Sequence, residues 1–280
     1  MDDRQATARD DSRATLQALE LSDGLREGVN REIIAALELP AGSAGLDLGC
    51  GVGTQALLLA AAVGPRGRVT GLDIEPAFVQ RARAKAAAAG LAERLTFTPG
   101  DSGDRLPFAD GAFDWVWSAD FLGYRPELPA EVCRVIRPGG RLLVLFWSAE
   151  QLLPGYPLLE ARLRATRGGL APFDRDSDPA AHPLRGMARL RAVGLEDISA
   201  QTFAATVCGP LQPATRRAML AVFAMRWPAA AAELSAADAA LHRRLTDPDS
   251  PDCILDLPDY YGFFTYSLFQ GRRPATALKA

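Results

Sequence analysis

The most constraining feature of the sequence is an apolar strand that ends in three alternating glycines and continues into an alanine- and leucine-rich helix, at residues 46–63. The glycines are Gly49, Gly51 and Gly53. Backbone without side chains lets a ligand lie directly against it. The helix that follows directs its free N–H groups toward the same place. This unit therefore predicts a parallel α/β sheet that holds a nucleotide-like ligand at the end of its first strand.

A second apolar run, residues 68–73, ends in Asp73. An acidic side chain at the end of such a strand can accept hydrogen bonds from both hydroxyls of a ribose, as it does in dinucleotide folds. Those folds more often show G-x-G-x-x-G, whereas here the third glycine follows the second by two residues. An NAD-linked dehydrogenase is therefore disfavoured. The structural alternative for Asp73 is the N-cap of the next helix.

Residues 47–54 together with Asp73 resemble the cofactor site of the class I S-adenosylmethionine (SAM) methyltransferases. Further segments appear in the order of that family, at residues 100–102, 106–108, 113–116 and 135–140. The resemblance is close over residues 40–147 and looser over 184–206. It is nearest to the small-molecule branch that includes ubiquinone- and menaquinone-type enzymes. It implies SAM as the cofactor and S-adenosylhomocysteine as the product.

The resemblance also implies which residues hold the cofactor. The glycine loop would contact the methionine end, Asp73 the ribose, Ile74 one face of the adenine, and Asp101 the adenine amino group, although Asp101 also suits a simple turn. Asp47 is expected to be buried, where its charge needs loop N–H groups or the ammonium group of the ligand as partners. Ser118 is expected to face the sulfur. The full set of implied cofactor-binding residues is Asp47, Gly49, Cys50, Gly51, Thr54, Asp73, Ile74, Gly100, Asp101, Ser102 and Ser118.

Strand and helix patterns alternate beyond the glycine loop, which predicts right-handed crossovers and a doubly wound sheet. We therefore expect an α/β fold with a seven-stranded Rossmann-like sheet and helical insertions. The resemblance implies that the N-terminal segment packs over the cofactor cleft as a helical lid, although a helix that only covers the flank of the sheet would fit equally well. In the family, six strands are parallel and the last strand is antiparallel beside the fifth. Residues 1–14 are expected to be disordered, and residues 15–39 are expected to form two short helices separated at Gly24 and Gly28.

Four segments follow from this pattern. They are a tail and lid at 1–39, a SAM-binding core at 40–147, an insertion over the acceptor site at 148–183, and the rest of the core at 184–280, with a helical excursion at 208–258. Apolar and aromatic residues in 148–183 and 208–258 suit an acceptor pocket, but they would equally form a small helical core or a homodimer interface.

Composition excludes several classes of protein. The net charge of −3 and the lack of a basic run argue against a nucleic-acid partner. The four cysteines are scattered, and no cluster of carboxylates and histidines indicates a metal site. The chain opens with charged residues and has no apolar run of membrane-spanning length. We therefore expect neither a signal peptide nor a membrane partner, and we expect a cytoplasmic location.

Methyl transfer from a sulfonium is an in-line displacement that needs alignment and exclusion of water rather than a particular side chain. Relatives often carry histidines after the fourth strand, whereas this chain has Tyr124 there. Tyr124 and His182 are the candidate catalytic residues, although Tyr124 would equally pack as an aromatic side chain at the end of a loop. Asp120 either binds substrate or caps a turn, and His242 is expected at the surface. The predicted function is methylation of a small organic acceptor at carbon, oxygen or nitrogen; the alternatives are a catalytically silent SAM-binding protein and an RNA or protein methyltransferase.

Overall fold

The computed structural model describes residues 2–100, 105–122, 128–171, 173 and 176–275, with side chains from residue 16 onward except at 128 and 129. By its internal contacts the chain divides into two compact units. We call residues 29–147, 178–203 and 266–280 the Rossmann unit, and residues 1–28, 148–177 and 204–265 the helical unit. The segment boundaries expected from the sequence stay a prediction.

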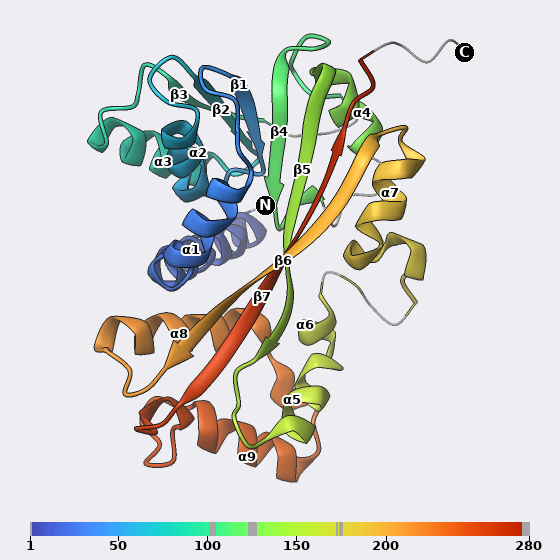
Figure 1. The fold of residues 1–280 in the computed structure, drawn as a ribbon. Helices are drawn as coiled ribbons and strands as arrows, with labels where there is room; N and C mark the ends of the chain where they lie inside the picture. The colour runs from blue at the N-terminus through green and yellow to red at the C-terminus, as the bar shows by residue number, and fades with distance from the viewer. Residues whose placement is uncertain (1, 101–104, 123–127, 172, 174–175, 276–280) are drawn as a thin grey trace. The chain divides into compact units, whose positions relative to one another are not determined.

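Seven strands form one sheet in the order β3-β2-β1-β4-β5-β7-β6 (Figure 1). The strands are β1 (Ala44–Leu48), β2 (Arg68–Asp73), β3 (Leu95–Pro99), β4 (Phe113–Ala119), β5 (Ile136–Gln151), β6 (Glu196–Cys208) and β7 (Tyr261–Arg272). β1 pairs in parallel with β2 and β4, β2 with β3, and β4 with β5. The strand order therefore reverses beside β1, and such a switch point leaves a crevice at the carboxyl ends of β1 and β4.

β7 lies between β5 and β6 and runs antiparallel to both. Beside β5, the Arg273 N–H donates to the Gly140 carbonyl at 2.8 Å, and the Ser148 hydroxyl lies 2.9 Å from the Thr265 hydroxyl. Residue numbers thus rise along one strand as they fall along the other, and side-chain pairs between β7 and β6 show the same reversal. The predicted sheet of six parallel strands with the last strand antiparallel is confirmed. β5, β6 and β7 each contribute residues to both units.

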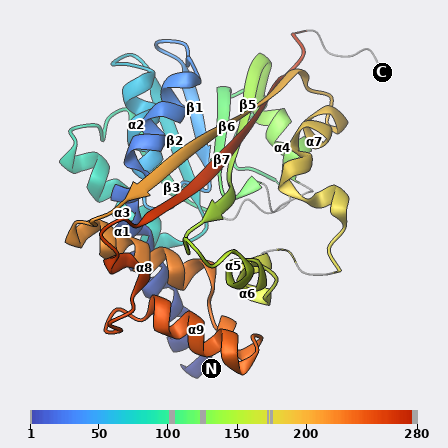
Figure 2. The ribbon, with the colours of Figure 1, turned by 60° about the horizontal axis from the view of Figure 1, so that its bottom comes forward.

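Helices cover both faces of the sheet within the Rossmann unit (Figure 2). They are α2 (Thr54–Ala62), α3 (Pro76–Ala88), α4 (Leu128–Val135) and α7 (Gly186–Ala192). Successive side chains of β4 point to opposite faces. Val116 joins a buried cluster with Val132 of α4 and Leu190 of α7, whereas the Trp117 indole N–H donates to Gln55 of α2 at 3.1 Å. The sheet is therefore doubly wound, as the alternating pattern predicted.

The N-terminal segment forms one long helix, α1 (Asp2–Ala36), which corrects two expectations. Residues 2–14 are helical rather than disordered, and no break separates two helices at Gly24 and Gly28. A Cβ atom built on either glycine meets no atom within 4 Å. Glycine costs a helix interior about 0.5–1 kcal/mol relative to alanine. Packing of the last turns, where Ile33 and Ile34 are buried, offsets that cost. The role of this segment as a lid stays a prediction.

The helical unit carries the remaining α-helices, and its core fixes the end of β5. These helices are α5 (Pro157–Arg164), α6 (Arg167–Leu170), α8 (Pro213–Arg226) and α9 (Ala236–Thr246), with short 3-10 turns between them. The buried Glu160 carboxylate accepts the Leu152 N–H at 2.6 Å, and the Tyr260 hydroxyl donates to the Leu152 carbonyl at 3.0 Å. Burial raises the pKa of Glu160. Among the described helices, none is both long enough and apolar enough to cross a bilayer.

Candidate functional site

The glycine loop between β1 and α2 is tight on one side and open at its middle. Gly49, Gly51 and Gly53 have φ angles of 79°, 50° and 77°, a backbone region that other residues adopt only at a cost. A Cβ atom on Gly53 would lie 2.8 Å from the Cβ of Ala82 on α3, so the loop presses directly on that helix. A Cβ atom on Gly51 would meet no atom within 4 Å. The bare backbone at Gly51 is therefore accessible to a ligand.

Asp73, at the end of β2, braces this loop. Its carboxylate accepts the Gly51 N–H at 2.8 Å and the Glu75 N–H at 3.0 Å. The N-cap of α3 is Glu75, whose carboxylate accepts the Ala77 N–H at 3.4 Å. Glu75 therefore takes the N-cap role that was the structural alternative for Asp73. Sequence reasoning did not identify Glu75 as the cap. Burial raises the pKa of Asp73, and the two N–H groups partly offset that effect. Next to it, Ile74 is 62% exposed, an apolar surface beside the loop.

Asp47 is buried on β1 at 1% exposure, and its Oδ2 atom has no hydrogen-bond partner among the described residues. Burial, and then the charge of Asp73, raises the pKa of Asp47 to about 8. Burial also raises the pKa of the Cys50 thiol, which is therefore not a thiolate nucleophile. Two carboxylates with raised pKa values beside an open glycine loop favour a ligand that carries positive charge.

The other implied cofactor residues lie around the same strand ends or outside the described residues. The Lys85 ammonium donates to the Thr54 hydroxyl at 2.9 Å, and the Gly100 N–H donates to the Asp73 carbonyl at 2.9 Å. The first contact joins α3 to the start of α2, and the second joins the residue after β3 to the end of β2. The residues that lie outside the described part of the chain are Asp101, Ser102 and Tyr124. Their roles stay predictions.

The turn after β4 is held by side-chain contacts to the backbone. Ser118 is fully buried, and its hydroxyl oxygen accepts the Leu122 N–H at 3.1 Å. Asp120 has a φ angle of 51°, rare for a residue other than glycine, and its carboxylate accepts the Trp147 N–H at 2.7 Å. These contacts give Ser118 and Asp120 structural roles in the turn. The expected contact of Ser118 with the cofactor stays a prediction.

Phe121, inside this turn, packs against the glycine loop. A Cβ atom on Gly49 would lie 2.7 Å from the Cβ of Phe121. The glycine at position 49 is thus needed for this approach as well as for its positive φ angle. Sequence reasoning did not assign Phe121 to the site, because its contact depends on the left-handed conformation of Asp120. The tolerance of aspartate for that conformation is the only signal the sequence offers.

The two histidines lie elsewhere. His182 is exposed, and its Nδ1 accepts the Leu184 N–H at 3.2 Å, so it caps a short 3-10 turn. Its role as a base stays a prediction. His242 was expected at the surface, which is wrong: it is half-buried and packs edge-on against Trp227 with 5.9 Å between ring centroids, and burial lowers its pKa. In the described part of the chain, no three His, Cys, Asp or Glu side chains gather as a metal site requires.

Residues 46–140 match a family described as a methyltransferase domain. The chain is 36% identical over 128 residues to demethylmenaquinone methyltransferase of Symbiobacterium thermophilum. This match covers 45% of this chain and 51% of that protein. It is 33% identical over 198 residues to 27-O-demethylrifamycin SV methyltransferase of Amycolatopsis mediterranei, which covers 69% of this chain and 66% of that protein. This chain is a member of the class I SAM-dependent methyltransferase family. The predicted resemblance and cofactor are confirmed.

A solved structure extends the likeness to the whole fold. A chain from the complex between the Trm112 methyltransferase activator of Haloferax volcanii and a methyltransferase superposes with a TM-score of 0.56 at 21% identity. The match covers 95% of each chain and concerns the fold alone. The matched region spans about half of the first curated relative, so the activity, acceptor and partners of this methyltransferase-family protein are proposals.

The residues in the structure fit SAM. Its ammonium and sulfonium groups are cations, and Asp47 offers a buried oxygen without a partner beside the open loop. The Asp73 carboxylate can accept further hydrogen bonds, since each oxygen atom accepts more than one. The exposed side chain of Ile74 offers apolar surface to an adenine ring. The donor set and the accessible backbone at Gly51 therefore match the distinct parts of this cofactor.

Proposed function

We propose that the protein transfers a methyl group from SAM to a small organic acceptor, at carbon, oxygen or nitrogen. The observation that carries this proposal is the presence of two acidic side chains, Asp47 and Asp73, beside the glycine loop. Asp47 has an orphaned buried oxygen, and Asp73 braces a glycine loop that is open at Gly51. Burying an unpaired carboxylate is costly, and a cationic ligand removes that cost.

Each part of the cofactor would be held by a different element. Gly49, Cys50 and Gly51 would offer backbone groups to the methionine end, and Asp47 would accept from its ammonium group. Asp73 would accept from the ribose hydroxyls, and Ile74 would cover one adenine face. Thr54, at the start of α2, and Gly100, at the end of β3, would also contact the cofactor. Asp101 would contact the adenine amino group, Ser118 would face the sulfur, and Ser102 would also contact the cofactor.

When bound, SAM supplies a methyl group on a sulfonium, an electrophile that is already activated. The protein then has to place the acceptor in line with that group and keep water out. Transfer would form a bond between the acceptor and the methyl carbon as the sulfur–methyl bond breaks. The turn at 118–122 suits the positioning role, because Phe121 contacts the glycine loop and Asp120 and Ser118 hold the backbone. Tyr124 and His182 are the proposed groups for a proton, where the acceptor carries one.

A small acceptor is supported by two independent observations. The relatives of this chain include proteins named for the methylation of demethylmenaquinone and of 27-O-demethylrifamycin SV, which are small molecules. The chain itself carries 31 basic and 34 acidic residues and no basic run, so nothing in its charge suits a polyanion. The proposal therefore places an uncharged or weakly charged organic molecule beside the 118–122 turn.

Calorimetric titration with SAM tests the assigned site. Asp73→Ala should weaken SAM binding by at least about tenfold, since a charge-assisted hydrogen bond contributes roughly 1.5–3 kcal/mol. Glu75→Ala is the matched control, because it removes the cap of α3 and leaves Asp73 in place; its SAM affinity should stay within about threefold of wild type. Equal binding by wild type and Asp73→Ala would overturn the role of Asp73. Incubation of labelled SAM with a metabolite extract, and separately with RNA and protein, tests the acceptor class.

A further inference from the structure

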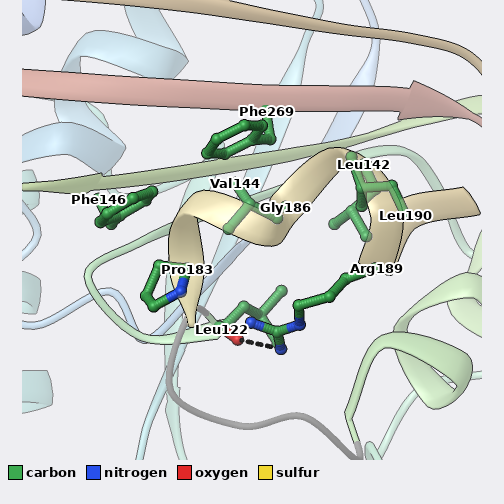
Figure 3. A pocket seen from close by; sticks show the side chains of 9 residues that line it. All are labelled: Leu122, Leu142, Val144, Phe146, Pro183, Gly186, Arg189, Leu190 and Phe269. Atoms are coloured by element: carbon green, nitrogen blue, oxygen red, sulfur yellow. Dashed lines mark hydrogen bonds between the residues drawn. The ribbon is translucent and has the colours of Figure 1, made fainter. Parts of the chain in front are cut away.

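A polar cavity of about 110 Å³ lies in the Rossmann unit, where β7 runs between β5 and β6. Leu142 of β5 and Phe269 of β7 belong to the core on the side of α7 (Figure 3). Because successive strand side chains point to opposite faces, Arg141, Gln270 and Arg272 share the other face of the sheet. The residues that line the cavity are Arg141, Asp197, Gln270, Gly271 and Arg272.

This cavity is separate from the candidate cofactor site. In the pairing of β4 with β5, Ser118 lies opposite Val144, whereas Trp115 lies opposite Arg141. Each strand residue advances the chain by about 3.3 Å, so Arg141 is roughly 10 Å along β5 from the level of Ser118, toward the amino end of the strand. A ligand in the cavity would therefore be bound apart from the cofactor.

The positive charge of the two arginines is only partly balanced. Arg272 pairs with the exposed Asp197 at 3.2 Å. Arg141 donates to the Leu37 carbonyl at 2.5 Å, and within the described part of the chain it makes no ion pair. Burial, and then the charge of Arg272, lowers the pKa of Arg141, and the charge of Glu38 offsets these effects only in part. An anion between the two guanidinium groups would relieve this repulsion.

The polar atoms of the cavity call for a ligand that both accepts and donates hydrogen bonds. Each guanidinium has five N–H groups, so Arg141 and Arg272 retain donors beyond their present contacts. The Gln270 amide donates to the Ser199 hydroxyl at 3.1 Å, but its Oε1 atom is buried without a partner among the described residues. A phosphate group with a pKa near 6 keeps a proton on part of its population at neutral pH and can donate it to such an oxygen. Sulfate and carboxylate groups have no proton to donate there.

We propose that this cavity binds a phosphate group, either free phosphate or the end of a small phosphate monoester. Its oxygens would accept from Arg141 and Arg272, and its hydroxyl would donate to Gln270. An enclosed cavity of about 150 Å³ is enough for benzene, so about 110 Å³ suits the more compact phosphate group. The site is an addition to the methyl-transfer function and does not rest on it.

Backbone amide NMR of the full chain, titrated with inorganic phosphate in chloride buffer near pH 7, tests the site. We expect saturable shifts at Gln270, Gly271 and Arg272 with a dissociation constant of about 1 mM or lower. Sulfate at equal ionic strength should bind at least about fivefold more weakly, because it has no proton for Gln270. The absence of saturable phosphate binding, or equal binding of sulfate, overturns the proposal.

Glycerol 3-phosphate distinguishes the two sources of the phosphate group. Affinity equal to or higher than that of inorganic phosphate would support a phosphate monoester as the ligand. Saturable binding of inorganic phosphate alone would support free phosphate, because the cavity would then exclude the ester group.

Matched variants locate the site. Arg141→Gln removes one guanidinium and should weaken phosphate binding by at least about tenfold. Arg68→Gln makes the same change at an exposed position of β2 outside the cavity, and its affinity should stay within about twofold. Gln270→Glu supplies a carboxylate inside the cavity, so it should abolish phosphate binding and raise the midpoint of thermal unfolding by about 2–4 °C in phosphate-free buffer. Wild-type phosphate affinity in Arg141→Gln or in Gln270→Glu overturns the site.

The glycine loop is the competing location for phosphate, because helix N-termini bind such anions. Saturating phosphate should leave the SAM affinity of wild type within about twofold of its phosphate-free value. Phosphate binding that SAM abolishes would place the phosphate at the glycine loop and overturn the second site. If wild type fails to bind SAM, the proposed function fails, and the phosphate titration still decides whether this cavity is a binding site.

Discussion

An aspartate whose pKa is raised to about 8 keeps its proton in the folded chain at a pH where the unfolded chain has released it. For Asp47 this window runs from its ordinary value of 3.8 up to about 8. The folded state binds more protons across that window, so the free energy of unfolding of the ligand-free chain falls as pH rises through it. Each pH unit changes this free energy by up to about 1.4 kcal/mol.

Asp47→Asn should therefore gain stability relative to wild type as pH rises from 5 to 8, on the order of 3 kcal/mol. Chemical denaturation at several pH values measures it, and the difference between the two chains removes the contribution of titrating groups that do not interact with Asp47. Asp249→Asn, at an exposed position, is the control and should follow wild type. Parallel stability curves for Asp47→Asn and wild type would contradict a raised pKa at this residue.

Residue roles that depend on local sequence could be predicted, and roles that depend on a distant partner could not. The placement of Gly49, Gly51 and Asp73 at strand ends follows from the chain immediately around them. Glu75 rather than Asp73 caps α3, because the Asp73 carboxylate accepts the Gly51 N–H of the glycine loop. That partner is distant in the sequence. The left-handed conformation of Asp120 depends on an N–H group of β5, 27 residues away.

The contact between the glycine loop and α3 predicts different stability losses for two glycine substitutions. Gly53 and Gly90 both have positive φ angles, but a Cβ atom on Gly53 would lie 2.8 Å from Ala82, whereas one on Gly90 would meet no atom within 4 Å. Gly90→Ala should lower the free energy of unfolding by about 1–2 kcal/mol, the cost of the backbone conformation alone. Gly53→Ala should lose about 1–3 kcal/mol more, because α3 must shift.

Urea denaturation of both variants measures these losses, with the slope of the transition compared to wild type to confirm that the same surface unfolds. Because the two substitutions are identical, the difference between them reports the packing of the loop on α3. Equal losses at both positions would mean that α3 moves away without cost, and the close approach at Gly53 would then have no energetic role.

Elements with strong internal patterns were predictable, whereas their ends and continuity were not. The alternation of strand and helix patterns predicted the doubly wound sheet, and the structure has seven strands in one sheet. α1 runs through Gly24 and Gly28 because burial of its last turns offsets two glycines, which a local pattern does not contain. β5 extends from Ile136 to Gln151, beyond its apolar run, because β7 pairs with it along both ends.

The charge of the whole molecule bears on the acceptor. The chain carries 31 basic and 34 acidic residues, a net charge of −3. A protein that holds RNA through 6–10 phosphate contacts loses about 10³–10⁵ in affinity between 50 and 200 mM salt, because bound counterions are released. Binding of an uncharged apolar small molecule has no such dependence, and higher salt slightly favours its burial.

The rate of methyl transfer to small acceptors should therefore change by less than about twofold between 50 and 200 mM salt, relative to the SAM affinity measured at the same salt. SAM affinity is the necessary control, since the cofactor is charged and its binding beside Asp47 and Asp73 is itself screened. Labelled SAM incubated with a metabolite extract and with RNA at both salt concentrations gives the comparison. Label found only in RNA, with a rate that collapses as salt rises while SAM affinity holds, would place the acceptor among polyanions. Such a result would require a basic surface that arises only from the folded arrangement of isolated arginines, because the sequence contains no basic run.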